Sequence, residues 1–387
     1  MLRFEHVSLS YGSQQILDDL SFEIQEGQMA VLIGPSGCGK TTTLKMINRL
    51  IEPTAGRIYL DGQDITTKDK VELRRHIGYV IQQIGLFPNM TVAQNISVVP
   101  TLLKYSREEC DRIVRELLDM VNLPYEQYAH KYPSEMSGGQ QQRIGILRAL
   151  AASPPIVLMD EPFSALDPMT RAELQDEIHT LQKKTRKTVV FVTHDMDEAI
   201  KLADRICIIQ EGHIVQCDTP ERILKAPANQ YVTDFIGANR LWANPEYIRA
   251  RDIMRRRPIT ISRGRTVLQA LQIMRQSGVD SLLVVDGRDR LLGVLWLEEL
   301  MSEKDSSGSA ETYLSDDYVA VEGDTTLKEI ISTIDYDVSG IIPVIEHDRT
   351  LVGFLTKSSL LATMSRQFVP EHTAGERSGV IWAAAAH

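Results

Sequence analysis

Residues Gly34-Pro-Ser-Gly-Cys-Gly-Lys-Thr41 match the spacing G-x-x-x-x-G-K-[ST], and the apolar run Ala30-Val-Leu-Ile33 stands directly before them. A helix-forming stretch follows the motif. Glycines let backbone N–H groups curl around phosphate oxygens, and a helix that begins here directs its positive end at the same anion. Because a strand, this loop and a helix follow one another, the segment predicts a phosphate-binding loop in a layered α/β domain with mostly parallel strands.

The loop and the start of its helix contain these candidate nucleotide contacts: Gly34, Ser36, Gly37, Gly39, Lys40, Thr41 and Thr42. Lys40 is expected to reach the β- and γ-phosphates. We expect the Thr41 hydroxyl to hold Mg²⁺ together with Asp160, which ends the apolar run 156–159. The expected cofactors are therefore ATP and Mg²⁺.

Two further residues suggest hydrolysis by water. Glu161 directly follows Asp160, and His194 follows the next apolar strand, 189–192. A carboxylate base beside an imidazole that senses the γ-phosphate suits attack by water. Taken alone, an Asp-Glu pair is more often a helix cap and a single His is more often structural. Their order behind the phosphate loop favours the catalytic interpretation.

Ser137-Gly138-Gly139-Gln140 precedes a helix that we expect over 141–151. The start of that helix would present backbone donors and the Ser137 hydroxyl to a terminal phosphate. The alternative is an ordinary serine cap.

Composition excludes several classes of protein. The chain has 387 residues, 43% of them hydrophobic, and a formal net charge of -10, which argues against broad nucleic-acid binding. An apolar run of the ~18 residues that cross a bilayer is absent, and the first residues lack a secretion signal, so we expect a soluble protein made inside the cell. The four cysteines, Cys38, Cys110, Cys207 and Cys217, have no C-x-x-C spacing and are expected to be reduced thiols.

An internal repeat occupies the second half of the chain. The segment 283–295 realigns with 343–355 at an offset of 60 residues. Each copy reads as one βαββα unit, too small to be stable alone, so the two copies should pack together. The predicted organisation is therefore an ATPase domain at 1–237 with a helical subdomain at about 85–150, a linker at 238–250, repeats at 251–305 and 311–366, and a disordered tail at 367–387.

Together these motifs resemble the ATP-binding-cassette (ABC) family over residues 1–237. The resemblance implies a homodimer in which ATP lies between the phosphate loop of one subunit and Ser137, Gly139 and Gln140 of the other. It also implies that Tyr11 stacks on adenine and that Asp167 crosses the dimer interface. Gln82 would link Mg²⁺ and the attacking water to a permease-facing region. Met136 stands where leucine is usual, a swap that conserves apolar volume.

Three segments narrow the resemblance: 46–53, 77–88 and 193–200 are similar to the ATPase subunits of compatible-solute importers, which carry glycine betaine, carnitine or choline. That family implies integral-membrane permease subunits, an extracytoplasmic substrate-binding protein, and a peripheral place on the cytoplasmic face of the membrane. A soluble cassette ATPase acting on nucleic acid or protein complexes is the alternative, although such proteins usually carry a coiled-coil insertion or two cassettes. A nucleotide sensor without turnover is disfavoured because Glu161 and His194 are both present.

The repeats resemble cystathionine-β-synthase (CBS) domains, which implies an α+β tandem module that associates with itself. Such repeats usually carry Ser/Thr-x-x-Asp, but Trp296-Leu-Glu-Glu299 and Thr356-Lys-Ser-Ser359 lack the aspartate, which argues against ordinary AMP or ATP binding. In related ATPases the repeats respond to cyclic di-AMP or ionic strength; a purely structural dimerisation role is the alternative. The candidate regulatory contacts are Trp296, Tyr313, Tyr336 and Thr356, and the aromatic residues among them could equally be packing residues.

An arginine cluster lies at the start of the first repeat and comprises Arg249, Arg251, Arg255, Arg256 and Arg257. It could bind a phosphate-bearing ligand or an anionic membrane. A solvated face is the more common role of such a run.

Overall fold

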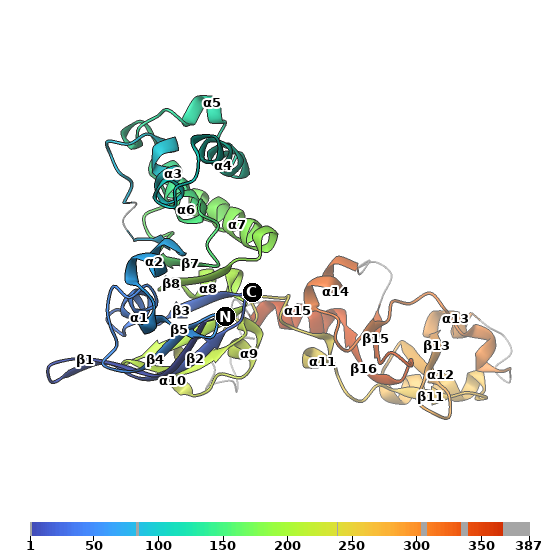
Figure 1. Cartoon of the computed structure of the whole chain (residues 1–387). Coiled ribbons are helices and arrows are strands. Elements are labelled where there is room, and N and C mark those ends of the chain that lie inside the picture. Colours follow the sequence, from blue (N-terminus) through green and yellow to red (C-terminus); the bar gives the residue numbers. More distant parts are fainter. Residues whose placement is uncertain (1, 83–84, 238, 303–307, 334–339, 367–387) are drawn as a thin grey trace, which may run out of the picture. The chain divides into compact units, whose positions relative to one another are not determined.

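The computed structural model describes residues 2–82, 85–237, 239–302, 308–333 and 340–366 (Figure 1). The chain divides into two compact units, with the boundary in the sequence between Phe235 and Ile236. Tyr336, a predicted regulatory contact, lies outside the described residues. The tail 367–387, which was predicted to be disordered, lies outside them as well.

A six-stranded, mostly parallel sheet forms the centre of the first unit. Its strands, in spatial order, are β10 (His213–Asp218), β9 (Arg205–Gln210), β3 (Met29–Ile33), β8 (Thr188–Thr193), β7 (Ile156–Asp160) and β6 (Ile77–Val80). Every residue of β3, β7 and β8 is buried, as expected for parallel strands covered on both faces. Only β10 runs antiparallel to its neighbour within this sheet. The α/β core predicted from the apolar runs is confirmed.

A second, antiparallel sheet packs against the first. It contains β2 (Gln14–Ile24), β1 (Leu2–Tyr11), β4 (Ala55–Leu60) and β5 (Gln63–Asp64), in that order. Its inward side chains, among them Phe4 and Leu20, share one core with Leu32 and Leu158 of the parallel sheet. The phosphate loop therefore directly follows a strand, β3, that is packed on both faces.

Helices surround this core and form a separate lobe. Those around the sheets are α1 (Lys40–Ile47), α2 (Lys70–Arg75), α7 (Pro168–Thr185), α8 (Met196–Leu202), α9 (Pro220–Lys225) and α10 (Gln230–Ile236), with 3-10 turns at Ile65–Thr67 and Pro133–Glu135. The lobe contains α3 (Val92–Leu102), α4 (Arg107–Met120), α5 (Tyr125–Tyr128) and α6 (Gly138–Leu150), and lies above β7 and β8 in Figure 1. It has its own apolar core. Among the described residues, no helix has the length and apolarity needed to cross a membrane.

The second unit consists of two βαββα repeats. The first contains β11 (Thr260–Ser262), α12 (Val267–Ser277), β12 (Ser281–Val285), β13 (Leu291–Trp296) and α13 (Leu297–Met301). The second contains β14 (Val321–Glu322), α14 (Leu327–Thr333), β15 (Ile341–Ile345), β16 (Leu351–Thr356) and α15 (Lys357–Ser365). Two short elements precede them, α11 (Ala250–Ile253) and a 3-10 turn at Ala310–Tyr313. Strand β16 starts and ends 60 positions after β13, as the sequence repeat predicts.

The repeats exchange their leading segments, which the sequence did not indicate. Met254 packs into the core of the second repeat, and Arg255 pairs with Phe354 of β16. Sixty positions later, Leu314 packs into the core of the first repeat, and Ser315 pairs with Val294 of β13. Each repeat is thus completed by the segment that leads into the other, which is a physical reason for the two copies to fold together.

The segment expected to be a linker belongs to this second unit. Leu241, Trp242, Ile248 and Ala250 pack in the core of the second repeat. Residues 241–250 are therefore part of a folded module, because their apolar side chains complete its core.

Candidate functional site

The phosphate loop is shaped by glycines at points of close approach. A Cβ at Gly34 would lie 2.1 Å from the carbonyl oxygen of Ile209. Gly39 has φ +105°, a left-handed conformation that side chains disfavour, and a Cβ there would lie 2.3 Å from Leu17 Cδ2. Larger residues at either position would displace the loop from the sheet.

Lys40 is buried at the first position of α1 and its ammonium lies within the loop. Its Nζ donates to the carbonyl oxygens of Gly34 and Pro35, both at 2.8 Å. The positive charge is therefore held at the curve of the loop, where the predicted role of Lys40 in binding phosphate requires it.

Thr41 and Asp160 meet across two elements. The Oγ1 hydroxyl of Thr41 donates to Oδ1 of Asp160 at 2.8 Å. Burial raises the pKa of Asp160, and the hydrogen bond from Thr41 opposes that shift. A buried carboxylate beside a hydroxyl offers the hard oxygen donors that Mg²⁺ prefers. The described residues contain no cluster of three or more His, Cys, Asp or Glu side chains that could hold a metal ion.

Glu161 sits at a strained turn directly after β7. Its φ is +46°, uncommon for a residue with a side chain, and its backbone N–H donates to the Val192 carbonyl at 3.0 Å. Its carboxylate accepts a hydrogen bond from Gln82 Nε2 at 3.0 Å and lies 3.6 Å from His194 Nδ1. The three predicted catalytic residues therefore lie together at the carboxyl ends of neighbouring strands.

A buried polar network behind His194 was not predicted. Glu198 accepts a hydrogen bond from Thr193 Oγ1 at 2.6 Å and lies 4.0 Å from Arg171 Nε. Arg171 in turn donates to the carbonyl of Leu166 at 3.1 Å. Burial raises the pKa of Glu198, while the Thr193 hydrogen bond favours its ionised form. The network joins the segment after β7 to the segment after β8. Its only signal in the sequence was Glu198 itself, an acidic residue four positions after His194.

The Ser-Gly-Gly-Gln segment begins α6, three residues earlier than expected. Ser137 caps the helix: its Oγ accepts from the Gln140 N–H at 3.3 Å, while Gln140 Oε1 accepts from the Ser137 N–H at 3.1 Å. Gly139 lies in the first turn, where a Cβ would come 2.6 Å from Thr170 Cγ2. Within the described residues, no hydrogen bond of Ser137, Gly139 or Gln140 reaches the phosphate loop.

Several predicted contacts lie on the surface of the first unit. Tyr11 ends β1 with 57% of its surface exposed, and Ser36 and Ser137 are exposed as well. Asp167 is an exposed cap of α7 that accepts from the Thr170 N–H at 3.1 Å, and hydrogen bonds from Thr170 lower its pKa. Thr42 is half-buried on α1. The exposed side chains among these residues are therefore accessible to a ligand or to another protein chain.

The predicted regulatory residues have separate surroundings. Trp296 packs in the cluster between the two repeats, and a Cβ at Gly340 would lie 3.7 Å from its ring. Tyr313 packs against the core of the first repeat. Thr356 caps α15 through its hydroxyl, which accepts from the Ser359 N–H at 3.2 Å. All three are half-buried.

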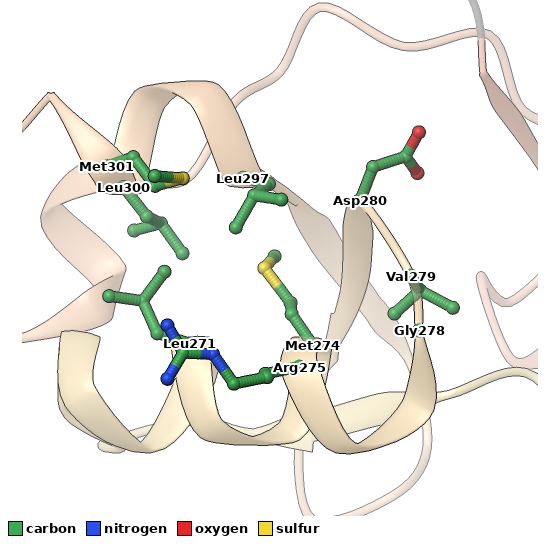
Figure 2. Close-up of a pocket in the computed structure, with 9 residues that line it drawn as sticks. All are labelled: Leu271, Met274, Arg275, Gly278, Val279, Asp280, Leu297, Leu300 and Met301. Atoms are coloured by element: carbon green, nitrogen blue, oxygen red, sulfur yellow. The ribbon is translucent and has the colours of Figure 1, made fainter.

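The first repeat also contains a groove that the sequence did not predict. Figure 2 shows this groove, of about 750 Å³, between α12 and α13, with Arg275 and Asp280 as its charged residues. Its apolar lining comprises Leu271, Met274, Val279, Leu297, Leu300 and Met301. Met301 is 70% exposed, and Leu361, its counterpart 60 positions later, is 66% exposed.

The arginine cluster is partly neutralised. Arg249 lies 3.6 Å from Asp324, and Arg251 forms an ion pair with the same carboxylate. Arg256 and Arg257 are exposed. This arrangement favours a solvated face.

The comparisons with known proteins agree with this geometry. The ABC transporter family matches residues 17–164, and the CBS domain family matches residues 250–303 and 310–366. The chain is 51% identical over 368 residues to the glycine betaine/carnitine/choline transport ATP-binding protein OpuCA of Bacillus subtilis (strain 168), covering 93% of this chain and 95% of that protein. It is 41% identical to the osmoprotectant import ATP-binding protein OsmV of Salmonella typhimurium, covering 90% of this chain and 91% of that protein.

Among solved structures, the ATP-binding cassette MJ0796 in a dimeric post-hydrolysis state bound to ADP and Pi is similar. Its TM-score is 0.51 at 36% identity, and the match covers 57% of this chain and 99% of that one. This coverage corresponds to one cassette.

The fold and the phosphate-loop site define an ABC-type ATPase domain, as the motifs predicted. The chain belongs to the ABC transporter family, among the osmoprotectant-transport ATP-binding subunits that carry tandem CBS domains.

Proposed function

We propose that this chain hydrolyses ATP to power the import of a quaternary-ammonium osmolyte such as glycine betaine, carnitine or choline. The observation that carries the catalytic part is the meeting of Thr41, Asp160, Glu161 and Gln82 at one edge of the sheet. The choice of osmolyte rests on the relatives, whose names specify these solutes. The pocket for the osmolyte would lie on other subunits.

In this proposal each residue of the site has one task. Lys40 neutralises charge on the β- and γ-phosphates, while Thr41 and Asp160 hold Mg²⁺. Mg²⁺, when bound, supplies positive charge to the phosphate oxygens. Glu161 accepts a proton from the attacking water. Its carboxylate is oriented by Gln82 Nε2, at 3.0 Å, and by His194 Nδ1, at 3.6 Å.

We propose further that two chains close around ATP, so that Ser137 of the partner subunit faces the phosphate loop. The exposed Ser137 hydroxyl and the exposed Asp167 support this arrangement, because an isolated chain leaves both uncovered. The likeness to a dimeric cassette bound to ADP and Pi supports it as well. Domain 1–237 would supply this homodimer contact.

A groove beside Gln82 is the proposed contact for a cytoplasmic segment of a permease subunit. It has a volume of about 310 Å³ and is lined by residues that include Arg74, Ile81, Phe87, Val98, Val99 and Arg148. Phe87 is 44% exposed there. Ile81 directly precedes Gln82, so a permease segment in the groove would act on the residue that bonds Glu161. The chain would then be peripheral on the cytoplasmic face, with an extracytoplasmic protein delivering the solute.

For the repeats we propose regulation of transport through cyclic di-AMP or ionic strength, by a module that self-associates. The exposed Met301 and Leu361 support self-association, because equivalent helices of both repeats present an apolar side chain. A second copy would cover the groove of Figure 2. Trp296, Tyr313 and Thr356 remain the proposed ligand contacts, with Tyr336 outside the described residues. A purely structural role of the module predicts no ligand binding.

Purification from membranes tests the proposal. The full chain, expressed with its native membrane partners, should co-purify with integral subunits and support uptake of radiolabelled glycine betaine, carnitine or choline. Phe87→Ser should reduce co-purification while ATP binding persists. A chain that hydrolyses ATP but is recovered only with soluble protein or nucleic acid would favour the alternative, a soluble cassette ATPase.

A further inference from the structure

Cys207 and Cys217 are directly opposite each other on neighbouring antiparallel strands. In the β9–β10 ladder, Cys217 is the register partner of Cys207. Opposed residues in such a ladder project from the same face of the sheet. Both side chains pack in the core between the two sheets of the first unit.

This placement is compatible with a disulfide. Opposed residues of an antiparallel pair have Cα atoms about 4.5 to 5.5 Å apart. Disulfides span Cα separations of about 4.4 to 6.8 Å. The register therefore places the two Cα atoms within the range of separations that a disulfide spans.

The two thiols differ in reactivity. Cys207 is fully buried, and both its hydrogen bond to Cys217 and its burial raise its pKa. Cys217 is half-buried, and the hydrogen bond from Cys207 together with the Arg205 guanidinium lowers its pKa to about 7. Arg205 Nη2 lies 3.8 Å from Cys217 Sγ and donates to the Cys217 carbonyl at 2.9 Å. A thiolate beside a cation is the reactive form of cysteine.

We propose that Cys217 and Cys207 form a peroxide-reactive dithiol, in which Cys217 is oxidised first and Cys207 then closes a disulfide. The Cys217 sulfur attacks hydrogen peroxide; the O–O bond breaks, a sulfenic acid forms and water leaves. The Cys207 sulfur attacks the Cys217 sulfur; the S–S bond forms, the S–O bond breaks, and hydroxide leaves as water with the Cys207 proton. Two thiols are oxidised by two electrons, and one peroxide is reduced to two waters.

The site joins the edge strand β10 to β9, which neighbours the strand that carries the phosphate loop. Ile208 on β9 pairs with Ile33 at the end of β3. Neither cysteine is among the nucleotide-site residues, so Cys217→Ser should retain basal ATPase activity and thereby report correct folding.

The full-length protein is treated with hydrogen peroxide, its free thiols are alkylated under denaturing conditions, and its peptides are analysed by mass spectrometry. We expect a Cys207–Cys217 linked peptide and the loss of two of the four thiols per chain, restored by dithiothreitol. Cys217→Ser should abolish the linkage. Cys110→Ser, which changes a half-buried thiol on α4, should leave it intact.

A second variant keeps the test decisive if Cys217→Ser fails to fold. Cys207→Val retains apolar volume in the core and should leave Cys217 as a sulfenic acid that a dimedone probe traps. Over-oxidation of Cys217 in the native chain without a disulfide, a linkage through Cys110 between chains, or four thiols that survive peroxide would each overturn the proposal.

Discussion

The Thr41 hydroxyl lies 2.8 Å from the Asp160 carboxylate, although the two residues are 119 positions apart in the chain. Strand β7 carries Asp160 to the edge of the sheet where the helix after the phosphate loop begins. Burial raises the pKa of Asp160, and a Mg²⁺ ion held by this pair, as in the proposed function, would offset the cost of burying its carboxylate.

Asp160→Asn should lower ATP hydrolysis about a hundredfold or more, because the metal ion contributes several kcal/mol of charge stabilisation. Phosphate release measured against Mg²⁺ concentration checks this result. Thr41→Ser keeps a hydroxyl and is the matched control, with near-normal activity expected. An Asp160→Asn protein with unchanged Mg²⁺ dependence would remove Asp160 from the metal site.

Glu161→Gln should slow turnover ~10²-fold or more, because the amide cannot take a proton from water. ATP-dependent dimerisation, measured by size-exclusion chromatography, should persist. The carboxamide oxygen can still accept the hydrogen bond from Gln82, so the geometry is kept while the base is lost. Near-normal phosphate release would show that another group performs this step.

Gly353→Ala should destabilise the repeat module by about 1–3 kcal/mol through overpacking. A Cβ at Gly353 would lie 2.7 Å from Met254 Sδ and 2.8 Å from the Arg255 carbonyl oxygen, atoms of the exchanged segment. Urea unfolding of the full chain measures the effect. Gly287→Ala, where a Cβ meets nothing within 4 Å, is the control. Equal stability of the two variants would argue against the exchange.

The solubility of a truncated chain should depend on whether residues 241–250 are kept. A chain ending at 237 should bind ATP and be insensitive to cyclic di-AMP. A chain ending at 250 leaves Leu241, Trp242 and Ile248 without the core they pack in, so it should aggregate. Light scattering and binding of a hydrophobic dye compare the two. Inhibition by cyclic di-AMP in the shorter chain would place the sensor outside the repeats.

Alkylation of Cys217 should depend on pH with a midpoint of about 7. The thiolate is the reacting form, so the rate rises as pH increases through the pKa and levels off above it. Arg205→Met removes the neighbouring cation and should move the midpoint upward. Peptide mapping after brief iodoacetamide treatment at a series of pH values gives the profile. A midpoint at the ordinary thiol value would show that Arg205 and Cys207 do not perturb Cys217.

Motif order along the chain was sufficient to predict the parallel sheet and the phosphate loop, and it singled out Asp160, Glu161 and His194, which directly follow two apolar strands. Local patterns carry this information because buried parallel strands are continuous apolar runs, and their carboxyl ends meet at one edge of the sheet. The repeat of 60 residues likewise predicted two βαββα units.

Other features depend on contacts between distant residues. The pairing of Cys207 with Cys217 depends on strand register, and the bulge in the ladder between Ile214 and Gln216 is invisible in residue spacing. The Glu198 network and the exchange of Met254 and Leu314 between repeats likewise arise from packing. Sequence periodicity indicates which side of a strand or helix is apolar, but the partner of that side is selected by the free energy of the whole folded chain.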